Sequence, residues 1–281
     1  MAKADPNKTT STGHMLADID RLQLHYRAKK TEYEATLRSV GLKKGWKVLD
    51  AGCGVGSFLP LMAELVGKDG HISAIDLAPE NIEYVESLVA EKEFSCSIEP
   101  RVGNVLSLPY EDNTFDAIWS ANVIQYLTEE ELGLCLSEAY RVIRPGGLVA
   151  VKEVDVSIMQ YQPLDPVLVQ HVFEAGRGQF TQVEGYFRAI RLPTWVRETG
   201  FINIRPKTTL YERWHPLSPI EQEFIGNNLA YVASLAEKVE ITEEEKEIWR
   251  EIGKAPGHLM EHPDFYFRTM HVLVVGQKPA V

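Results

Sequence analysis

The segment from Trp46 to Leu59 constrains the fold of this chain more than any other. It reads WKVLDAGCGVGSFL: a short apolar run, then glycines at alternate positions, then residues that favour a helix. Gly52, Gly54 and Gly56 can adopt a left-handed backbone and let a ligand approach with no Cβ in the way. A strand, a glycine-rich loop and a helix in this order are typical of nucleotide-binding α/β folds. We therefore expect an α/β domain with a ligand site at this loop.

The glycine spacing distinguishes this loop from two other nucleotide-binding loops. The third glycine follows the second by two residues, whereas a dinucleotide-binding loop places it three residues later. The helix that follows lacks the Lys-Ser/Thr pair of a phosphate-binding loop. Both differences argue against a pyrophosphate ligand, and the spacing also argues against a nicotinamide-dependent dehydrogenase.

A carboxylate follows the glycine loop at the sequence separation that is typical of nucleotide-binding folds. The apolar run from His71 to Asp76 ends in this acid, 20 residues after Gly56. In nucleotide-binding folds, a carboxylate at the end of the second strand accepts hydrogen bonds from ribose hydroxyls. Asp76 is therefore our predicted ribose ligand.

Two further segments complete the pattern. Residues 100–122 contain PRVGNVLSLP and NTFDAIWSAN, and residues 140–153 read YRVIRPGGLVAVKE. With the glycine loop and Asp76, they resemble the class I S-adenosylmethionine (SAM)-dependent methyltransferases. The closest likeness is to the small-molecule branch that includes the ubiquinone and menaquinone C-methyltransferases. The resemblance is strong over residues 22–153 and looser in parts of the carboxyl-terminal half.

The resemblance implies SAM as the cofactor and a set of residues that hold it. For Asp50 it leaves two roles open: orienting the loop through backbone hydrogen bonds, or meeting the ammonium group of SAM through water. Asn104 departs from the family pattern, because many relatives carry an aspartate there that accepts a hydrogen bond from the adenine amino group. The Asn104 carbonyl can accept the same bond without charge assistance. The predicted SAM contacts are Asp50, Gly52, Gly54, Gly56, Asp76, Leu77, Asn104, Val105, Asn122 and Tyr26.

The residues that would contact the methyl acceptor follow less directly. Glu153 ends the fifth predicted strand, at the edge where open α/β sheets bind ligands, and is our candidate general base. The alternative is a carboxylate paired with a cation at the rim of the sheet. Gln125 and Tyr126 follow the fourth predicted strand and face the cofactor, the acceptor or the start of a helix.

Residues beyond the fifth strand provide further candidates for acceptor binding. His171 and Arg177 lie in a locally basic stretch that would suit an anionic acceptor, with a solvated basic surface as the alternative. Tyr186 belongs to a group of aromatic residues that suffices for an apolar or prenylated acceptor, although such residues also form ordinary cores.

The order of predicted elements indicates a doubly wound, mostly parallel sheet with a Rossmann-like core and a helical cap. Residues 1–15 are polar and aperiodic and are expected to be disordered, which leaves residues 16–281 as the methyltransferase domain. Helical periodicity predicts one amphipathic helix over residues 16–40. The predicted cap consists of residues 16–40, 154–186 and 215–263. The predicted strands are 46–50, 71–76, 98–102, 115–120, 147–153, 201–214 and 266–275, and the main helices are 57–66, 79–91, 129–143 and 192–200.

Composition narrows the possible partners. The formal net charge of −11 argues against a nucleic-acid substrate, which needs clustered lysines and arginines. Three scattered cysteines indicate a reducing compartment, and no cluster has the spacing of metal ligands. No apolar run is long enough for a membrane span, and no signal peptide is recognisable. We expect a cytoplasmic enzyme without a metal, possibly a homo-oligomer formed through the amino-terminal helix.

The sequence thus predicts a SAM-dependent methyltransferase that acts on a small, apolar or aromatic, possibly prenylated metabolite. An RNA or protein methyltransferase is the alternative within the class. A non-catalytic SAM-binding sensor is the alternative outside it.

Overall fold

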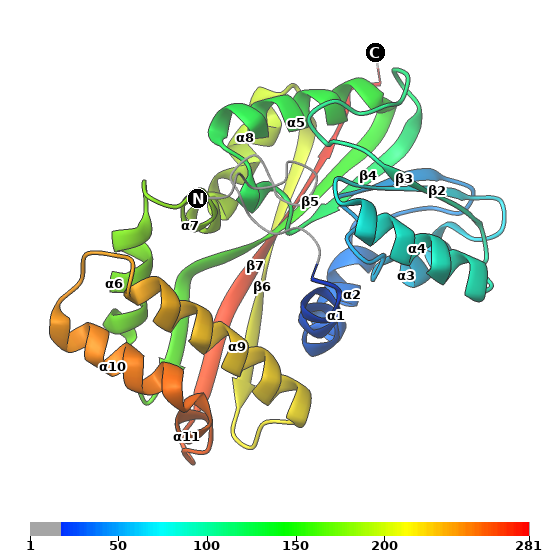
Figure 1. The fold of residues 1–281 in the computed structure, drawn as a ribbon. Coiled ribbons are helices and arrows are strands. Elements are labelled where there is room, and N and C mark those ends of the chain that lie inside the picture. The colour runs from blue at the N-terminus through cyan, green and yellow to red at the C-terminus, as the bar shows by residue number, and fades with distance from the viewer. Residues whose placement is uncertain (1–17, 281) are drawn as a thin grey trace.

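The structure, a computed structural model, describes residues 18–280 and is built around one sheet. The described strands lie in the order β3-β2-β1-β4-β5-β7-β6 (Figure 1). The first five strands are parallel, whereas β7 is antiparallel to both β5 and β6. The strands are β1 (Lys47–Ala51), β2 (His71–Asp76), β3 (Ser97–Val102), β4 (Phe115–Ala121), β5 (Ile143–Gln162), β6 (Ile202–Trp214) and β7 (Tyr266–Gln277). The predicted fold class is confirmed, while the predicted disordered segment 1–15 lies outside the described residues.

Helices cover both faces of this sheet. Neighbouring residues of a strand point to opposite faces. Val48 therefore enters the core formed with α2 (Lys30–Arg38), α3 (Leu59–Val66) and α4 (Pro79–Glu91). Leu49 enters the opposite core, formed with α5 (Glu129–Val142) and α8 (Leu192–Glu198). Both side chains are fully buried, so the strands hold the loops at their carboxyl ends on a rigid base.

Local sequence signals explain where the core helices begin. Pro79 occupies the first turn of α4, where its missing N–H removes no helical hydrogen bond. Thr128 and Glu131 form a reciprocal capping box at the start of α5. The bounds of β2 and α4 coincide with the predicted ranges 71–76 and 79–91.

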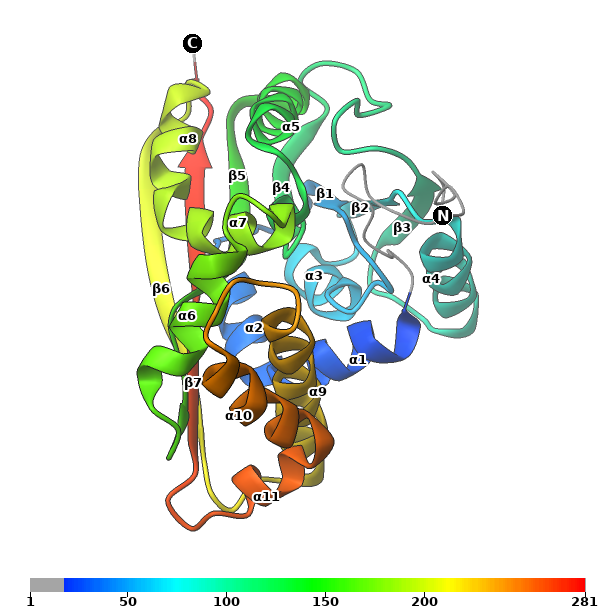
Figure 2. The same ribbon diagram turned by 60° about the vertical axis from the view of Figure 1, so that its left-hand side comes forward.

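A third hydrophobic core lies beyond the carboxyl ends of β1–β4 and defines the part that we call the cap. It joins the distal halves of β5, β6 and β7 to six helices. In Figures 1 and 2 these three strands run from the main sheet into the cap, and α9 lies beside α1. The cap helices are α1 (Ile19–Ala28), α6 (Pro166–Gly176), α7 (Thr181–Arg188), α9 (Pro219–Ala236), α10 (Glu243–Lys254) and α11 (Pro256–Met260).

Two predictions about this half of the molecule are wrong. Residues 154–162 are strand, because β5 continues through a bulge between Asp155 and Gln160 and stays paired with β7 as far as Gln162 and Tyr266. The predicted helix 16–40 is two helices, α1 and α2, that meet at Lys29. The Lys29 N–H donates to the Tyr26 carbonyl instead of continuing the α-helical pattern, and its side chain turns into the interior.

Among residues 18–280, no helix is both long enough and apolar enough to cross a membrane.

Candidate functional site

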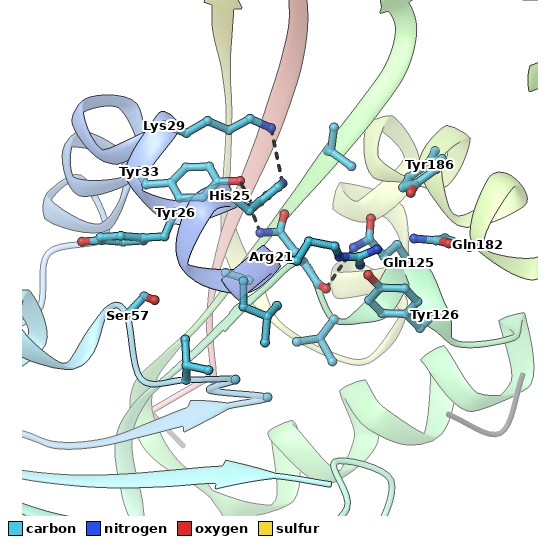
Figure 3. Close-up of a pocket in the computed structure, with 18 of the residues that line it drawn as sticks. Arg21, His25, Tyr26, Lys29, Tyr33, Ser57, Gln125, Tyr126, Gln182 and Tyr186 are labelled. Carbon is cyan, nitrogen blue, oxygen red and sulfur yellow. Dashed lines mark hydrogen bonds between the residues drawn. The ribbon is translucent and has the colours of Figure 1, made fainter. Parts of the chain in front are cut away.

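A cavity of about 350 Å³ lies between the carboxyl ends of β1, β2 and β4 and the cap. The glycine loop and Asp76 form part of one wall, and aromatic residues of the cap form another. Figure 3 shows Tyr26, Lys29 and Tyr33 on one side of it, and Gln125, Tyr126 and Tyr186 on the opposite side. The strand edge predicted from the sequence is therefore one boundary of this cavity.

Backbone hydrogen bonds hold the glycine loop in place. The N–H groups of Gly52 and Cys53 both donate to the carbonyl of Ile75, at 2.8 and 2.9 Å, which anchors the loop on β2. Gly52, Gly54 and Gly56 have φ angles of +79°, +52° and +70°. A Cβ on Gly52 would lie 2.4 Å from Cγ2 of Val123, so this position needs glycine for its backbone and for its close packing.

Asp76 fixes the same loop from β2. Its Oδ2 accepts the Gly54 N–H at 2.8 Å, and its Oδ1 accepts the Ala78 N–H and the Asn81 amide, each at 3.0 Å. Burial raises the pKa of this carboxyl, and the three donors oppose that shift. Asp76 also lines the cavity. The carboxylate that holds the glycine loop is therefore the same one that we predict to bind the ribose.

Asp50 is the more unusual acid of this wall. It is 2% exposed, and its Oδ2 has no hydrogen-bond partner among the described residues. Burial, together with the nearby charge of Asp76, raises the pKa of Asp50 to about 8. A buried carboxyl oxygen without a donor, at the edge of a cavity, fits a ligand that brings its own positive charge or N–H group. The ammonium group of SAM is such a ligand.

The predicted adenine contacts also line the cavity. Leu77, Asn104 and Val105 contribute to its wall. The side-chain carbonyl of Asn104 already accepts the Leu106 N–H at 2.9 Å, and this hydrogen bond closes a local turn. A carbonyl oxygen has a second lone pair, so the adenine contact of Asn104 stays a prediction.

Asn122 and Tyr26 line the cavity from two different elements. Asn122 follows β4 directly with φ at +59°, and its side-chain oxygen accepts a 2.5 Å hydrogen bond from Lys152 Nζ. Its amide lies 3.4 Å from the hydroxyl of Tyr33. Tyr26 comes from α1 and donates to Glu34 at 3.3 Å. These contacts join the strand edge to the amino-terminal helices.

Of the residues predicted to bind the acceptor, three line the cavity and two do not. Gln125 and Tyr126, from the short helix Ile124–Tyr126, and Tyr186, from α7, belong to its wall (Figure 3). His171 lies on the outer side of α6 and pairs with Glu245 of α10, Nδ1 to Oε1 at 2.5 Å. Arg177 is bound to Glu174 and Glu184. The acceptor roles predicted for His171 and Arg177 are therefore wrong, because carboxylates outside the cavity hold both side chains.

Glu153 is fully buried and does not line the cavity. Its Oε1 accepts the N–H groups of Val123 and Ile124, at 2.8 and 2.9 Å. Burial raises the pKa of Glu153 to about 7, and the neighbouring Lys152 opposes the shift. The prediction that Glu153 is the general base is not supported by this position: its carboxyl faces the backbone after β4 and shapes the wall that carries Gln125.

A polar cluster that the sequence reading missed lies at the cap end of the cavity. Lys29 Nζ is 3.3 Å from Nε2 of His271 and 3.5 Å from Nε2 of His25. The other ring nitrogen of His25 is 3.2 Å from the hydroxyl of Tyr33. Lys29 stands in a polar stretch of the predicted helix, HYRAKKTE, which gives no local signal of burial, and its partner His271 is 242 residues away.

Comparisons with known proteins agree with the geometry of the strand edge. Residues 48–147 match the model of a family described as "Methyltransferase domain". The chain is 33% identical over 134 residues to a demethylmenaquinone methyltransferase of Bacillus subtilis, covering 46% of this chain and 54% of that one. It is 30% identical over 157 residues to one of Staphylococcus aureus, covering 54% and 59%. The chain thus spans a little over half the length of the curated relatives it matches.

A solved structure extends the likeness to nearly the whole chain at the level of the fold. Phosphoethanolamine N-methyltransferase 2 of Haemonchus contortus, in complex with SAM, aligns with a TM-score of 0.55 at 16% identity, over 93% of this chain and 57% of that one. The family match, the curated relatives and the cavity beside the glycine loop converge on one assignment. Residues 48–147 match a methyltransferase domain, and this part of the chain is similar to the demethylmenaquinone methyltransferases.

Proposed function

We propose that the protein is an enzyme that transfers the methyl group of SAM to a small, apolar or aromatic acceptor held beneath the cap. One observation carries this proposal: a single cavity has the glycine loop on one wall and aromatic cap side chains on another. A pocket of this kind suits a small molecule better than a polymer, because it is concave and combines apolar and aromatic side chains with a set of polar ones. The aromatic and aliphatic residues of the cap that line it include Val156, Met159, Tyr161, Phe173, Phe224, Tyr231 and Phe267.

The residues of the strand edge have the properties needed to hold the cofactor. Gly52 and Gly54 bring bare backbone to the cavity, and Asp50 supplies the unpartnered carboxyl oxygen described above. Bound SAM supplies a methyl group that its sulfonium already activates for displacement. The chain contributes alignment of the acceptor and exclusion of water, which are sufficient for most of the acceleration in such a reaction.

Because the curated relatives are demethylmenaquinone methyltransferases, a quinone is the first acceptor to test. The apolar cap wall is compatible with an aromatic ring or a prenyl tail, and a phenol or an indole would meet the same requirements. A SAM-binding sensor would need the cofactor wall but not the apolar wall. The extent of the apolar wall therefore favours catalysis over sensing.

Two measurements test the proposal. Calorimetry with SAM, S-adenosylhomocysteine and NAD should give binding of the first two and none of the third. A labelled-methyl assay should then give transfer to at least one of reduced demethylmenaquinone, a simple phenol, indole and a prenylated phenol. SAM binding without transfer to any of these, but with transfer to RNA or protein, would replace the proposed acceptor class. Binding without any transfer would favour the sensor.

A further inference from the structure

Lys29 is a buried lysine with no carboxylate partner in the described part of the chain. It is 2% exposed, and it lines the cavity from the junction of α1 and α2. The nearby Glu32 is engaged by Arg213, Nη1 to Oε1 at 2.7 Å. Lysines are almost never fully buried without an ion partner, so this position calls for a functional explanation.

The surroundings of Lys29 favour a neutral amine. Its Nζ lies 4.6 Å from the ring centroid of Phe224 and 5.1 Å from that of Tyr211. Ring faces attract a cation, but they do not replace the water that burial removes from the ammonium. Burial lowers the pKa of Lys29 to about 7, and Arg213 adds to that shift while Glu32 opposes it. Burial also lowers the pKa values of His25 and His271 well below the usual range, so both imidazoles are neutral. The titratable groups facing this amine are His25 and Arg21 from α1, Glu32 and Tyr33 from α2, Lys152 from β5, Tyr211 and Arg213 from β6, and His271 from β7.

We propose that Lys29 is the general base that takes the proton from the methyl acceptor. This inference rests on the proposed function and names the residue that completes it. As the acceptor atom bonds to the methyl carbon, the carbon–sulfur bond breaks with its electron pair remaining on sulfur. The proton of the acceptor moves to the lone pair of Lys29 Nζ, which becomes an ammonium.

This proton transfer leaves the net charge of the cavity unchanged. One positive charge disappears from sulfur and one appears on the lysine. A lysine that was already charged would instead place two cations in one buried space, which is strongly unfavourable. The neutral amine therefore suits both the bound cofactor and the reaction.

The other titratable groups of the cavity are poorer bases. Burial raises the pKa values of Tyr126 and Tyr186, so both phenols keep their protons at neutral pH. The pKa of His25 is too low for strong basicity. Asp50 has a pKa of about 8 and also lines the cavity, but it lies on the strand-edge wall, where we propose that the ammonium group of SAM binds. On the cap side, the Lys29 amine combines a pKa near the working pH, where a general base works best, with a place in the cavity.

The first test measures the charge state of Lys29 and needs no acceptor. The full chain is labelled with ¹³C-lysine, the Cε signals are followed by NMR from pH 5 to 11, and Lys29→Arg identifies the signal of Lys29 by its loss. The midpoint for Lys29 should lie near pH 7. A midpoint above pH 9 for Lys29 overturns the proposal.

The second test separates the base from the cofactor site. Lys29→Met and Lys29→Arg should bind SAM within about twofold of the original affinity but transfer the label to the best panel acceptor at least about 100-fold more slowly. Lys30→Met is the matched control and should keep full turnover. In the unaltered protein, kcat/KM for the acceptor should rise with pH to a plateau, with the midpoint found by NMR.

The two proposals fail in different ways. If the unaltered protein binds no SAM, the proposed function is wrong, and so is the assignment of Lys29 as its general base. If the protein methylates an acceptor and Lys29→Met keeps turnover within about threefold, only the assignment of Lys29 is wrong.

Discussion

The two walls of the cavity are built by opposite means. The strand-edge wall comes from one stretch of chain, residues 50–122, and uses backbone N–H groups and positive-φ glycines anchored on β2. The cap wall gathers side chains from α1, α6, α7, α9, β5 and β7, with Tyr33 of the neighbouring α2 beside them. In our proposal the first wall holds the cofactor, whereas the second has a composition that can vary with the acceptor. A site built from backbone groups needs glycine at fixed positions, whereas a site built from side chains can be formed by different residues.

The largest expected effect tests the rigidity of the strand-edge wall. Gly52→Ala should destabilise the fold by about 2–4 kcal/mol, because it combines a left-handed alanine with a Cβ placed 2.4 Å from the stiff side chain of Val123. Gly41→Ala is the matched control: its φ is +92°, but no atom lies within 4 Å of the added Cβ. Urea denaturation of both variants measures the difference. Equal losses would mean that the close approach to Val123 adds nothing.

The cap wall should behave in the opposite way, because removing its central polar group should stabilise the protein. Unfolded Lys29 keeps its proton to about pH 10.4, whereas folded Lys29 loses it near pH 7, so between these values the unfolded state binds more protons and stability rises with pH. Lys29→Met should remove this slope and stabilise the fold at pH 7 by about 1–4 kcal/mol. Thermal denaturation between pH 6 and 10 measures both effects.

Glu153→Gln provides the comparison at the backbone that follows β4. The folded pKa of Glu153 is raised to about 7 from an unfolded value of about 4.3, so its contribution to stability is present below pH 4.3 and is lost as the pH rises to 7. Glu153→Gln should therefore remove the fall of stability with pH between about pH 4.3 and 7 and leave the slope of stability against pH above 7 unchanged.

A Lys29→Met protein that is less stable than the original at pH 7 would contradict the assignment of a strained, neutral amine at Lys29.

A smaller effect is expected for ligand binding at Asp76. Asp76→Ala should weaken SAM binding at least tenfold, about 1.4 kcal/mol, because it removes a predicted ribose contact and the acceptor that holds the Gly54 N–H. Asn81→Ala is the control for the loop, since it removes one donor to the same carboxylate and leaves the carboxylate in place. Calorimetry gives both affinities. Unchanged SAM affinity in a folded Asp76→Ala protein would place the ribose elsewhere.

The smallest effect concerns the outer surface of the cap. His171→Ala removes the pair with Glu245, whose pKa is lowered to about 2 by that hydrogen bond and by Thr242. The His171 side chain is 53% exposed, so the loss of stability should stay below about 1 kcal/mol, with SAM affinity and turnover unchanged. A tenfold fall in turnover would restore His171 to the acceptor site.

The same contrast explains what the sequence could reveal. The limits of α4 and the capping box of α5 follow from signals within a few residues of each other, and both were predicted. The length of β5 was not, because its second half is stabilised by pairing with β7, more than 100 residues later. The break at Lys29 was also missed. Its cause is a set of partners from β6, β7 and α9, and a periodic apolar pattern carries no record of them.

The segment between β6 and β7 has a consequence for how such proteins diversify. Trp214 and Tyr266 are paired across the two strands, with ring centroids 4.1 Å apart, so residues 215–265 leave the sheet and return to it at adjacent positions. A tight hairpin turn could join the same two strands. The segment that carries α9, α10 and α11 can therefore be replaced as a module while the register of the sheet is kept. Exchanging this one insertion among related proteins offers a route to new acceptor preferences on an unchanged cofactor site.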